Sequence, residues 1–204
     1  MARVGILGGT FNPPHLGHLA LARSARAELG LAHVLLMPAN TPPHKLPSAD
    51  PGSAHRLQMC RLLAEGSDGV RACGLEIERG GRSYTVDTLR QVSRAQAGAR
   101  LVYVAGADSA STIAGWREPE GLFELADLAV GERSGAQPQQ VLDALAAVRG
   151  SASISFLKAP LLEISSSRAR QAAAEGAPLE ELVGTRVAAY IAEHELYGAG
   201  SPRG

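Results

Sequence analysis

The 204-residue sequence lacks several features that define whole classes of protein. It has only two cysteines, Cys60 and Cys73, which form no Cys-x-x-Cys pair and are too few for a disulfide framework. It has no apolar run of the ~20 residues that a membrane-spanning helix needs, and no hydrophobic leader of the kind that signal peptides carry. We therefore expect a soluble, cytoplasmic protein.

The chain also has no excess of charge of either sign, since 20 Lys and Arg residues balance 20 Asp and Glu residues. Nonspecific binding of nucleic acid needs a basic surface, so this balance favours a small substrate over a polymer. No nucleic-acid or membrane partner is expected, and a homo-oligomer is compatible with the sequence. At ~150 residues per domain, the length suits a single domain over residues 1–204, with a tail that is expected to fray beyond Gly198.

Short hydrophobic runs alternate with helical patterns along the chain. This alternation predicts an α/β fold of the Rossmann-like type, with a mostly parallel sheet covered by helices on both faces. Strands are predicted near residues 4–7, 34–37, 70–75, 101–105, 128–130 and 154–157. Helices are predicted near residues 16–29, 54–65, 86–97, 138–148, 167–175 and 186–195. The longest irregular stretch, residues 38–52, holds five of the 12 prolines and predicts a stiff surface loop.

The first predicted strand leads into the most informative segment, Gly8-Gly9-Thr10-Phe11-Asn12-Pro13-Pro14-His15-Leu16-Gly17-His18. Glycines have no Cβ, so they can adopt positive φ and let backbone N–H groups approach an anion. The helix predicted from Leu16 adds the positive end of its dipole, and His15 and His18 fall on the same side of its start. Because imidazole N–H groups donate to phosphate oxygens, the segment predicts a nucleoside triphosphate site.

Two other interpretations of these histidines stay open. A histidine near a helix start is commonly a capping or solvated surface residue. The spacing of His15 and His18 also suits two transition-metal ligands, but no glutamate lies between them as in His-Glu-x-x-His, and no third ligand is evident nearby. The sequence therefore predicts no metal held by the chain itself.

A second polar segment, Ile164-Ser165-Ser166-Ser167-Arg168-Ala169-Arg170, leads into a predicted helix near the C-terminus. Serine hydroxyls cap the free N–H groups of a helix start, and Arg170 presents a planar set of donors that suits a triphosphate. A plain serine cap with solvent-facing arginines is the alternative. The presence of the first segment favours the phosphate-binding interpretation.

Together the two segments resemble the signature motifs of the nucleotidylyltransferase superfamily, which has His-x-Gly-His near the N-terminus and Ile-Ser-Ser-Thr-x-x-Arg near the C-terminus. The resemblance implies the nucleotidylyltransferase fold, and it implies that His15, His18 and Arg170 are catalytic. It also implies that Arg133 borders the adenine of ATP. The ATP-binding residues implied in this way are Gly8, Gly9, Thr10, Phe11, His15, His18, Gly106, Asp108, Arg133, Ser165, Ser166, Ser167 and Arg170.

Further segments are similar to those of bacterial nicotinate-mononucleotide adenylyltransferases, namely Pro42-Pro43-His44-Lys45, Ser83-Tyr84-Thr85 and Gly106-Ala107-Asp108-Ser109. The only tryptophan, Trp116, matches the position where that family stacks an indole on the pyridine ring. Each of these residues also has an ordinary structural role open to it, so the prediction depends on their joint occurrence in family order. The residues implied to bind nicotinate mononucleotide are Lys45, Tyr84, Thr85, Asp108 and Trp116.

The resemblance implies transfer of the adenylyl group of ATP, with Mg²⁺, to nicotinate mononucleotide, giving deamido-NAD and pyrophosphate in NAD biosynthesis. A phosphopantetheine adenylyltransferase, a cytidylyltransferase and a catalytically silent nucleotide-binding regulator are the alternatives. The first of these typically lacks the segments around Lys45 and Thr85. The last is disfavoured by the intact His15, His18 and Arg170.

The chain departs from the family pattern at three places. Asn12 stands where Asp is more common, which removes a negative charge near the phosphates. Ser167 stands where Thr is more common, and it keeps the hydroxyl. Residues 131–135 read Gly-Glu-Arg-Ser-Gly where a sequence closer to Arg-Pro-Gly is expected.

Overall fold

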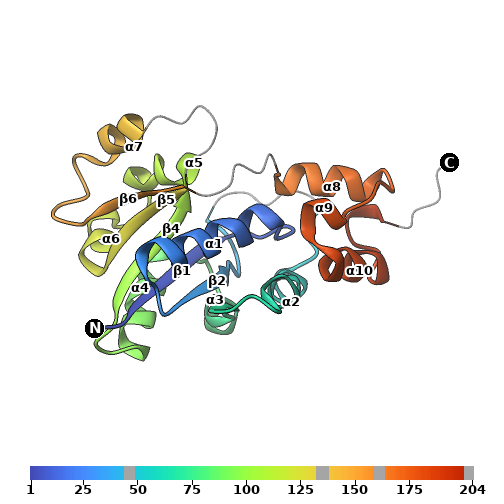
Figure 1. Cartoon of the computed structure of the whole chain (residues 1–204), viewed down its shortest axis with the longest axis horizontal. Helices are drawn as coiled ribbons and strands as arrows, with labels where there is room; N and C mark the ends of the chain where they lie inside the picture. The colour runs from blue at the N-terminus through green and yellow to red at the C-terminus, as the bar shows by residue number, and fades with distance from the viewer. Residues whose placement is uncertain (44–48, 132–137, 159–163, 200–204) are drawn as a thin grey trace.

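A computed structural model describes residues 1–43, 49–131, 138–158 and 164–199 (Figure 1). Six strands form one sheet in the order β3-β2-β1-β4-β5-β6, and each neighbouring pair is parallel. The strands are β1 (Arg3–Gly9), β2 (His33–Pro38), β3 (Val70–Ala72), β4 (Arg100–Gly106), β5 (Ala126–Gly131) and β6 (Ile154–Leu157). The predicted Rossmann-like α/β fold is confirmed.

Helices connect the strands and follow the last of them. The helices of the described residues are α1 (Leu16–Leu29), α2 (Ser53–Ala64), α3 (Leu75–Arg79), α4 (Thr85–Ala95), α5 (Ala107–Ala110), α6 (Pro119–Leu125), α7 (Pro138–Leu145), α8 (Ser166–Ala174), α9 (Glu180–Val183) and α10 (Thr185–Glu193), with 3₁₀ turns η1 (Ile113–Gly115) and η2 (Leu196–Gly198). In this part of the chain, every helix is too short or too polar to cross a membrane. The strand predicted to reach Leu75 is wrong at its end, because β3 stops at Ala72 and Leu75 begins α3.

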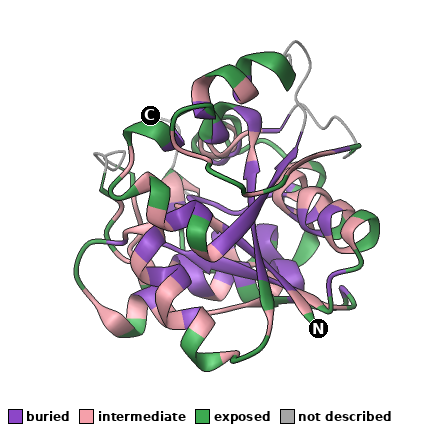
Figure 2. Ribbon diagram, turned by 90° about the vertical axis from the view of Figure 1, so that its left-hand side faces the viewer, coloured by how far each residue is buried: buried purple, intermediate pink, exposed green. Residues whose placement is uncertain are grey.

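Along β1, β2, β4, β5 and β6, alternate side chains pack into or against two different hydrophobic clusters, one on each face of the sheet. On β2, Leu36 belongs to one cluster, whereas Leu35 and Met37 belong to the other. Buried residues of α1, α2, α8, α9 and α10 complete the first cluster, and those of α4, α5, α6 and α7 complete the second. Figure 2 shows strands that are buried along much of their length between partly buried helices. Burial on both faces explains the near-continuous hydrophobic runs of the strands.

The C-terminal ends of β1 and β4 lie side by side, because the chain runs outward from β1 to β3 and then returns to β4. Leu7 of β1 pairs with Val104 of β4, and Gly9 pairs with Pro38 of β2. In open parallel sheets, ligands bind beyond the strand ends at such a reversal of strand order. The segments that follow Gly9, Pro38 and Gly106 therefore lie at the edge where a ligand site is expected.

The C-terminal helices return to the N-terminal part of the chain. Figure 1 shows α8, α9 and α10 gathered beside α2, and their buried residues share one hydrophobic cluster with α1 and α2. Ser166 Oγ donates a hydrogen bond of 2.9 Å to the carbonyl of Pro13. The two polar segments that the sequence singles out are thus spatial neighbours. The tail that was expected to fray lies, from residue 200 onward, outside the described residues.

Candidate active site

The first polar segment begins on a strand rather than in a turn. Gly8 and Gly9 are the last residues of β1, and neither is among the glycines with positive φ. The expectation that they adopt positive φ is therefore wrong, and it is Phe11 that has a positive φ, of 54°. A Cβ at Gly8 would lie 2.8 Å from Tyr103 Oη. Glycine is needed there because Tyr103 packs against the strand, not because of the backbone conformation.

His15 and His18 are held in a defined arrangement at the start of α1. His15 is the N-cap residue, and its backbone N–H donates to Nδ1 of His18 at 3.1 Å. The centroids of the two rings are 3.7 Å apart, and the His18 ring also lies 4.7 Å from the ring of Phe11. Because Nδ1 of His18 accepts a hydrogen bond, the neutral ring carries its proton on Nε2. A Cβ at Gly17 would lie 3.1 Å from the ring of His15, so glycine leaves room for this ring.

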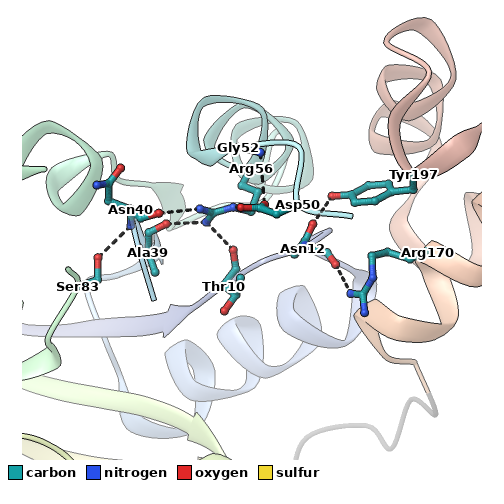
Figure 3. A network of polar contacts seen from close by, with 10 residues as sticks. All are labelled: Thr10, Asn12, Ala39, Asn40, Asp50, Gly52, Arg56, Ser83, Arg170 and Tyr197. Carbon is teal, nitrogen blue, oxygen red and sulfur yellow. Dashed lines mark hydrogen bonds and ion pairs between the residues drawn. The ribbon is translucent and has the colours of Figure 1, made fainter. Parts of the chain in front are cut away.

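The second polar segment is joined to the first by hydrogen bonds. Ser165 caps α8, and its hydroxyl accepts from the N–H of Arg168 at 3.2 Å. Arg170 Nη1 donates to the carbonyl of Asn12 at 2.7 Å (Figure 3). Its Nη2 donates to Ser167 Oγ at 3.1 Å. The second motif therefore lies against the loop that leads into α1.

Both segments carry groups that attract anions. Neither α1 nor α8 has an acidic residue in its first turn, so the positive ends of both helix dipoles are left uncompensated there. The Arg170 guanidinium and the two imidazoles add N–H donors, a set that suits anionic phosphate oxygens. Across the ranges that the structure describes, no group of three or more His, Cys, Asp or Glu residues is placed to hold a metal ion.

Asn12, one of the departures from the family pattern, is only 2% exposed. Its Oδ1 accepts a hydrogen bond of 2.8 Å from the hydroxyl of Tyr197 in η2 (Figure 3). Burial raises the pKa of Tyr197, which keeps its hydroxyl protonated and able to donate. Asn12 thus offers the acceptor that Tyr197 needs without placing a carboxylate in a buried position.

A pocket of about 310 Å³ lies next to the first motif. Residues 8–10 form part of its wall, and Tyr84 and Thr85 at the start of α4 form another part. Trp116, which directly follows η1, also lines it. The structure brings together in one cavity three segments that are far apart in the sequence.

Tyr103, on β4, also lines this pocket. The residue is 4% exposed, and its hydroxyl interacts with the side chain of Thr85. Burial raises the pKa of Tyr103, so its hydroxyl stays neutral at physiological pH. The ring of Trp116 stands edge-on to that of Tyr103, with centroids 6.0 Å apart, and Trp116 Nε1 donates to Thr112 Oγ1 at 3.1 Å. These contacts fix the orientation of the indole at the pocket.

Sequence reasoning missed three charged residues around this pocket. Glu76 lines it, is 6% exposed, and accepts a hydrogen bond of 2.6 Å from Thr88 Oγ1. Burial raises the pKa of Glu76, an effect that hydrogen bonds and nearby arginines oppose in part. Arg117 also lines the pocket, with its guanidinium 4.7 Å from the ring centroid of Tyr84. The third, Arg56, is fully buried behind Thr10. Only the position of Arg117 directly after the tryptophan could have signalled any of the three.

Several predicted site residues do not line this pocket, and the described ones among them are Phe11, His15, His18, Gly106, Asp108, Ser165, Ser166, Ser167 and Arg170. Asp108 lies in α5 with an exposed side chain, and it is the next residue, Ser109, that lines the cavity. Gly106, which ends β4, lies directly before them at the edge of the sheet. Lys45 and Arg133 fall outside the described residues, so their implied roles stay predictions.

A family model described as cytidylyltransferase-like matches residues 6–172. The match begins in β1 and ends in α8, so it contains both polar segments, the second half of β1 and all of the other five strands. The fold and the site define a member of the nucleotidylyltransferase superfamily.

Comparison with individual relatives identifies a more specific family within this superfamily. A probable nicotinate-nucleotide adenylyltransferase of Salinibacter ruber is 37% identical over 95% of this chain and 97% of its own length. One of Thermomicrobium roseum is 38% identical over 97% of this chain and 92% of its own length. The solved structure of Plasmodium falciparum nicotinic acid mononucleotide adenylyltransferase complexed with NaAD is 18% identical, covers 99% of this chain and 100% of that chain, and shares the fold with a TM-score of 0.81. This chain belongs to the nicotinate-nucleotide adenylyltransferase family.

Proposed function

We propose that this chain transfers the adenylyl group of ATP to nicotinate mononucleotide, giving deamido-NAD and pyrophosphate. The observation that carries the proposal is the shared cavity. Residues 8–10, which belong to the phosphate-binding motif, line the same pocket as Tyr84, Thr85 and Trp116. Two substrates that react directly with each other must be held in contact, and a joint cavity of this kind allows it. The names of the curated relatives support the same acceptor.

On the ATP side, we assign the triphosphate to the N–H donors of His15, His18 and Arg170 and to the two helix starts beside them. These groups stabilise negative charge as it moves onto the departing pyrophosphate. Mg²⁺ enters with the nucleotide as MgATP, because it prefers oxygen ligands and water whereas this site offers mainly nitrogen donors. Since Arg170 contacts the loop at Asn12, we also propose that residues 1–204 act as one domain.

The chemistry requires little of the protein beyond placement. A phosphate oxygen of the mononucleotide attacks the α-phosphorus of ATP, and the bond from that phosphorus to the oxygen shared with the β-phosphorus breaks. The electron pair leaves with pyrophosphate. A phosphate monoester is already ionised at neutral pH, since its second pKa is about 6, so neither a general base nor a covalent intermediate is needed. Catalysis then consists of positioning and charge stabilisation.

On the acceptor side, Thr85 places the N-terminus of α4 at the pocket. The positive end of this helix favours the carboxylate of nicotinate over the neutral amide of nicotinamide. Glu76 also lines the pocket, where burial raises the pKa of its carboxyl group. Trp116 supplies an aromatic surface for the pyridine ring. We keep for Lys45 the role of steering the incoming phosphate.

A panel of acceptors tests the proposal. ATP and Mg²⁺ are mixed with the chain and, in turn, nicotinate mononucleotide, nicotinamide mononucleotide, phosphopantetheine or no acceptor, and pyrophosphate release is measured. We expect fast release with nicotinate mononucleotide, together with deamido-NAD. Release with phosphopantetheine alone would assign the chain to that other class. Binding of ATP without release for any acceptor would show a silent nucleotide-binding protein.

A further inference from the structure

Arg56, on α2, is fully buried, an unusual environment for a guanidinium group. Burying a charge is costly unless its donors are paired. Nε donates to Asp50 Oδ1 at 3.0 Å. Nη1 donates to the carbonyls of Thr10, at 2.8 Å, and Ala39, at 2.6 Å, and Nη2 donates to the carbonyl of Asn40 at 2.9 Å (Figure 3). One side chain thus joins three backbone positions and one carboxylate.

The three carbonyls belong to the ends of neighbouring strands. Thr10 directly follows β1 and lines the pocket as part of the phosphate-binding motif. Ala39 and Asn40 directly follow β2, the strand paired with β1. Gly9 and Pro38 are the last residues that these two strands pair. Beyond them, Arg56 joins the two following segments by its hydrogen bonds.

The contacts continue from β2 to the acceptor side of the pocket. The backbone N–H of Asn40 donates to Ser83 Oγ at 2.9 Å, and its Nδ2 donates to the carbonyl of Gly81 at 3.0 Å. The N–H of Ser83 in turn donates to the carbonyl of Thr41 at 2.9 Å. Ser83 precedes the Tyr84-Thr85 pair at the start of α4. An unbroken series of hydrogen bonds therefore runs from Thr10, through Arg56 and Asn40, to the start of the acceptor segment.

We propose that Arg56 is a positioning residue that sets the spacing between the ATP side and the acceptor side of the pocket. The inference rests on the proposed function for the identity of the two substrates. Because Arg56 is fully buried, it acts through Thr10 and Asn40 and not by touching either substrate. A planar guanidinium holds several donors in fixed directions, which the ammonium of a lysine cannot reproduce. A reaction between two bound substrates is sensitive to such spacing, since a misplacement of about 1 Å costs about 10²-fold in rate.

Two substitutions test the proposal, Arg56→Lys and Arg56→Met. The matched control is Arg61→Met, which removes an exposed arginine from the same helix. A second control, Leu63→Ala, lowers stability through the core of α2, since Leu63 is 5% exposed. Rates are measured well below the melting temperature of each variant. We expect Arg56→Lys to lower kcat by about 10²-fold and to raise KM for both substrates. Arg56→Met should have larger effects on the same constants. Both controls should keep the parental kcat and KM values.

A purely structural role gives a different result. If Arg56→Lys matched the kinetic constants of Leu63→Ala once only folded protein was counted, the positioning role would be wrong. If neither Arg56 variant folds, Asp50→Asn provides the measurement, because it weakens one contact of Arg56 at a residue outside the pocket lining. We expect Asp50→Asn to lower kcat and to raise KM for both substrates, by less than the Arg56 variants would. Parental values of kcat and KM for Asp50→Asn would overturn the proposal.

Binding measurements separate this inference from the proposed function. Calorimetric titration with a non-hydrolysable ATP analogue needs no turnover, so it compares the parent with Arg56→Lys even if no acceptor supports the reaction. If Arg56→Lys binds the ATP analogue more weakly than the parent while Arg61→Met binds it equally well, the result supports the proposal that Arg56 acts through Thr10. Failure of the parent to form deamido-NAD would refute the proposed function and leave this comparison standing.

Discussion

Arg170 Nη1 donates a hydrogen bond of 2.7 Å to the backbone carbonyl of Asn12, across a sequence separation of 158 residues. This bond joins the two motifs that the sequence places at opposite ends of the chain. The other terminal nitrogen of Arg170 is hydrogen-bonded to Ser167 Oγ. The guanidinium is therefore oriented before any nucleotide arrives, which reduces the entropy lost when it binds phosphate.

The substitution Arg170→Lys tests whether catalysis depends on the positive charge of this residue alone or also on the orientation of its donors. The ammonium keeps the positive charge, but it cannot donate in both of these directions at once. We expect kcat for pyrophosphate release to fall by about 10²–10³-fold, the range typical of losing one well-placed donor. Arg168→Lys, at an exposed position of the same helix, is the control. Similar rates for the two variants would contradict the role given to Arg170.

His18→Ala should leave the fold intact and remove most adenylyl transfer. His18 is only half-buried, so its loss costs little packing, while its Nε2–H donor toward the triphosphate disappears. We expect an unchanged circular dichroism spectrum and a fall in kcat of about 10²–10³-fold. His194→Ala removes an exposed histidine of the C-terminal helices for comparison. Equal pyrophosphate release by His18→Ala and the parent at saturating substrates would show that His18 has no catalytic role.

Gly8→Ala tests the packing beneath the pocket. The new Cβ would lie 2.8 Å from Tyr103 Oη and 3.2 Å from Tyr103 Cε2, so the ring has to move. Because Tyr103 and Thr85 line the same pocket and interact there, we expect KM for nicotinate mononucleotide to rise. Adding Tyr103→Phe removes the closest atom and should restore part of the affinity relative to Gly8→Ala alone. A double variant no better than the single one would argue against this contact as the cause.

Glu76→Gln should change how stability depends on pH. The pKa of Glu76 is raised from 4.5 in the folded protein, so the folded state binds this proton more tightly than the unfolded chain does. The free energy of unfolding therefore falls as pH rises from the unfolded pKa through the folded one. We expect the melting temperature of Glu76→Gln, relative to the parent, to increase over that interval. Glu78→Gln, at an exposed position of the same helix, controls for loss of a carboxyl, and a pH-independent difference for Glu76→Gln would contradict the account.

Much of the fold could be predicted because its signals are local. The strands β1, β2, β4 and β5 each have a hydrophobic run that is buried on both faces of the sheet, and α1 occupies the predicted residues 16–29. The short helices α3, α5, α6 and α9 were not predicted, since four to seven residues are too few to show a helical period. β3 was predicted too long because Leu75 continues the hydrophobic pattern although it begins a helix.

The site was predictable only where motifs mark it. His15 and His18 are three residues apart at a helix start, and their placement follows from that spacing. Arg56 gives no such signal, because its hydrogen-bond acceptors come from the ends of two strands and from Asp50, and only the folded chain brings them together. Burial of Glu76 likewise depends on packing between α3 and α4, which no local pattern reports.

The central claim is tested most directly by comparing kcat/KM for nicotinate mononucleotide with kcat/KM for nicotinamide mononucleotide. The rate is measured as formation of the dinucleotide product from MgATP. The positive end of α4 at Thr85 favours a carboxylate in the pocket, so we predict a clear preference for the nicotinate substrate. Equal kcat/KM values for the two mononucleotides would contradict this account of the pocket.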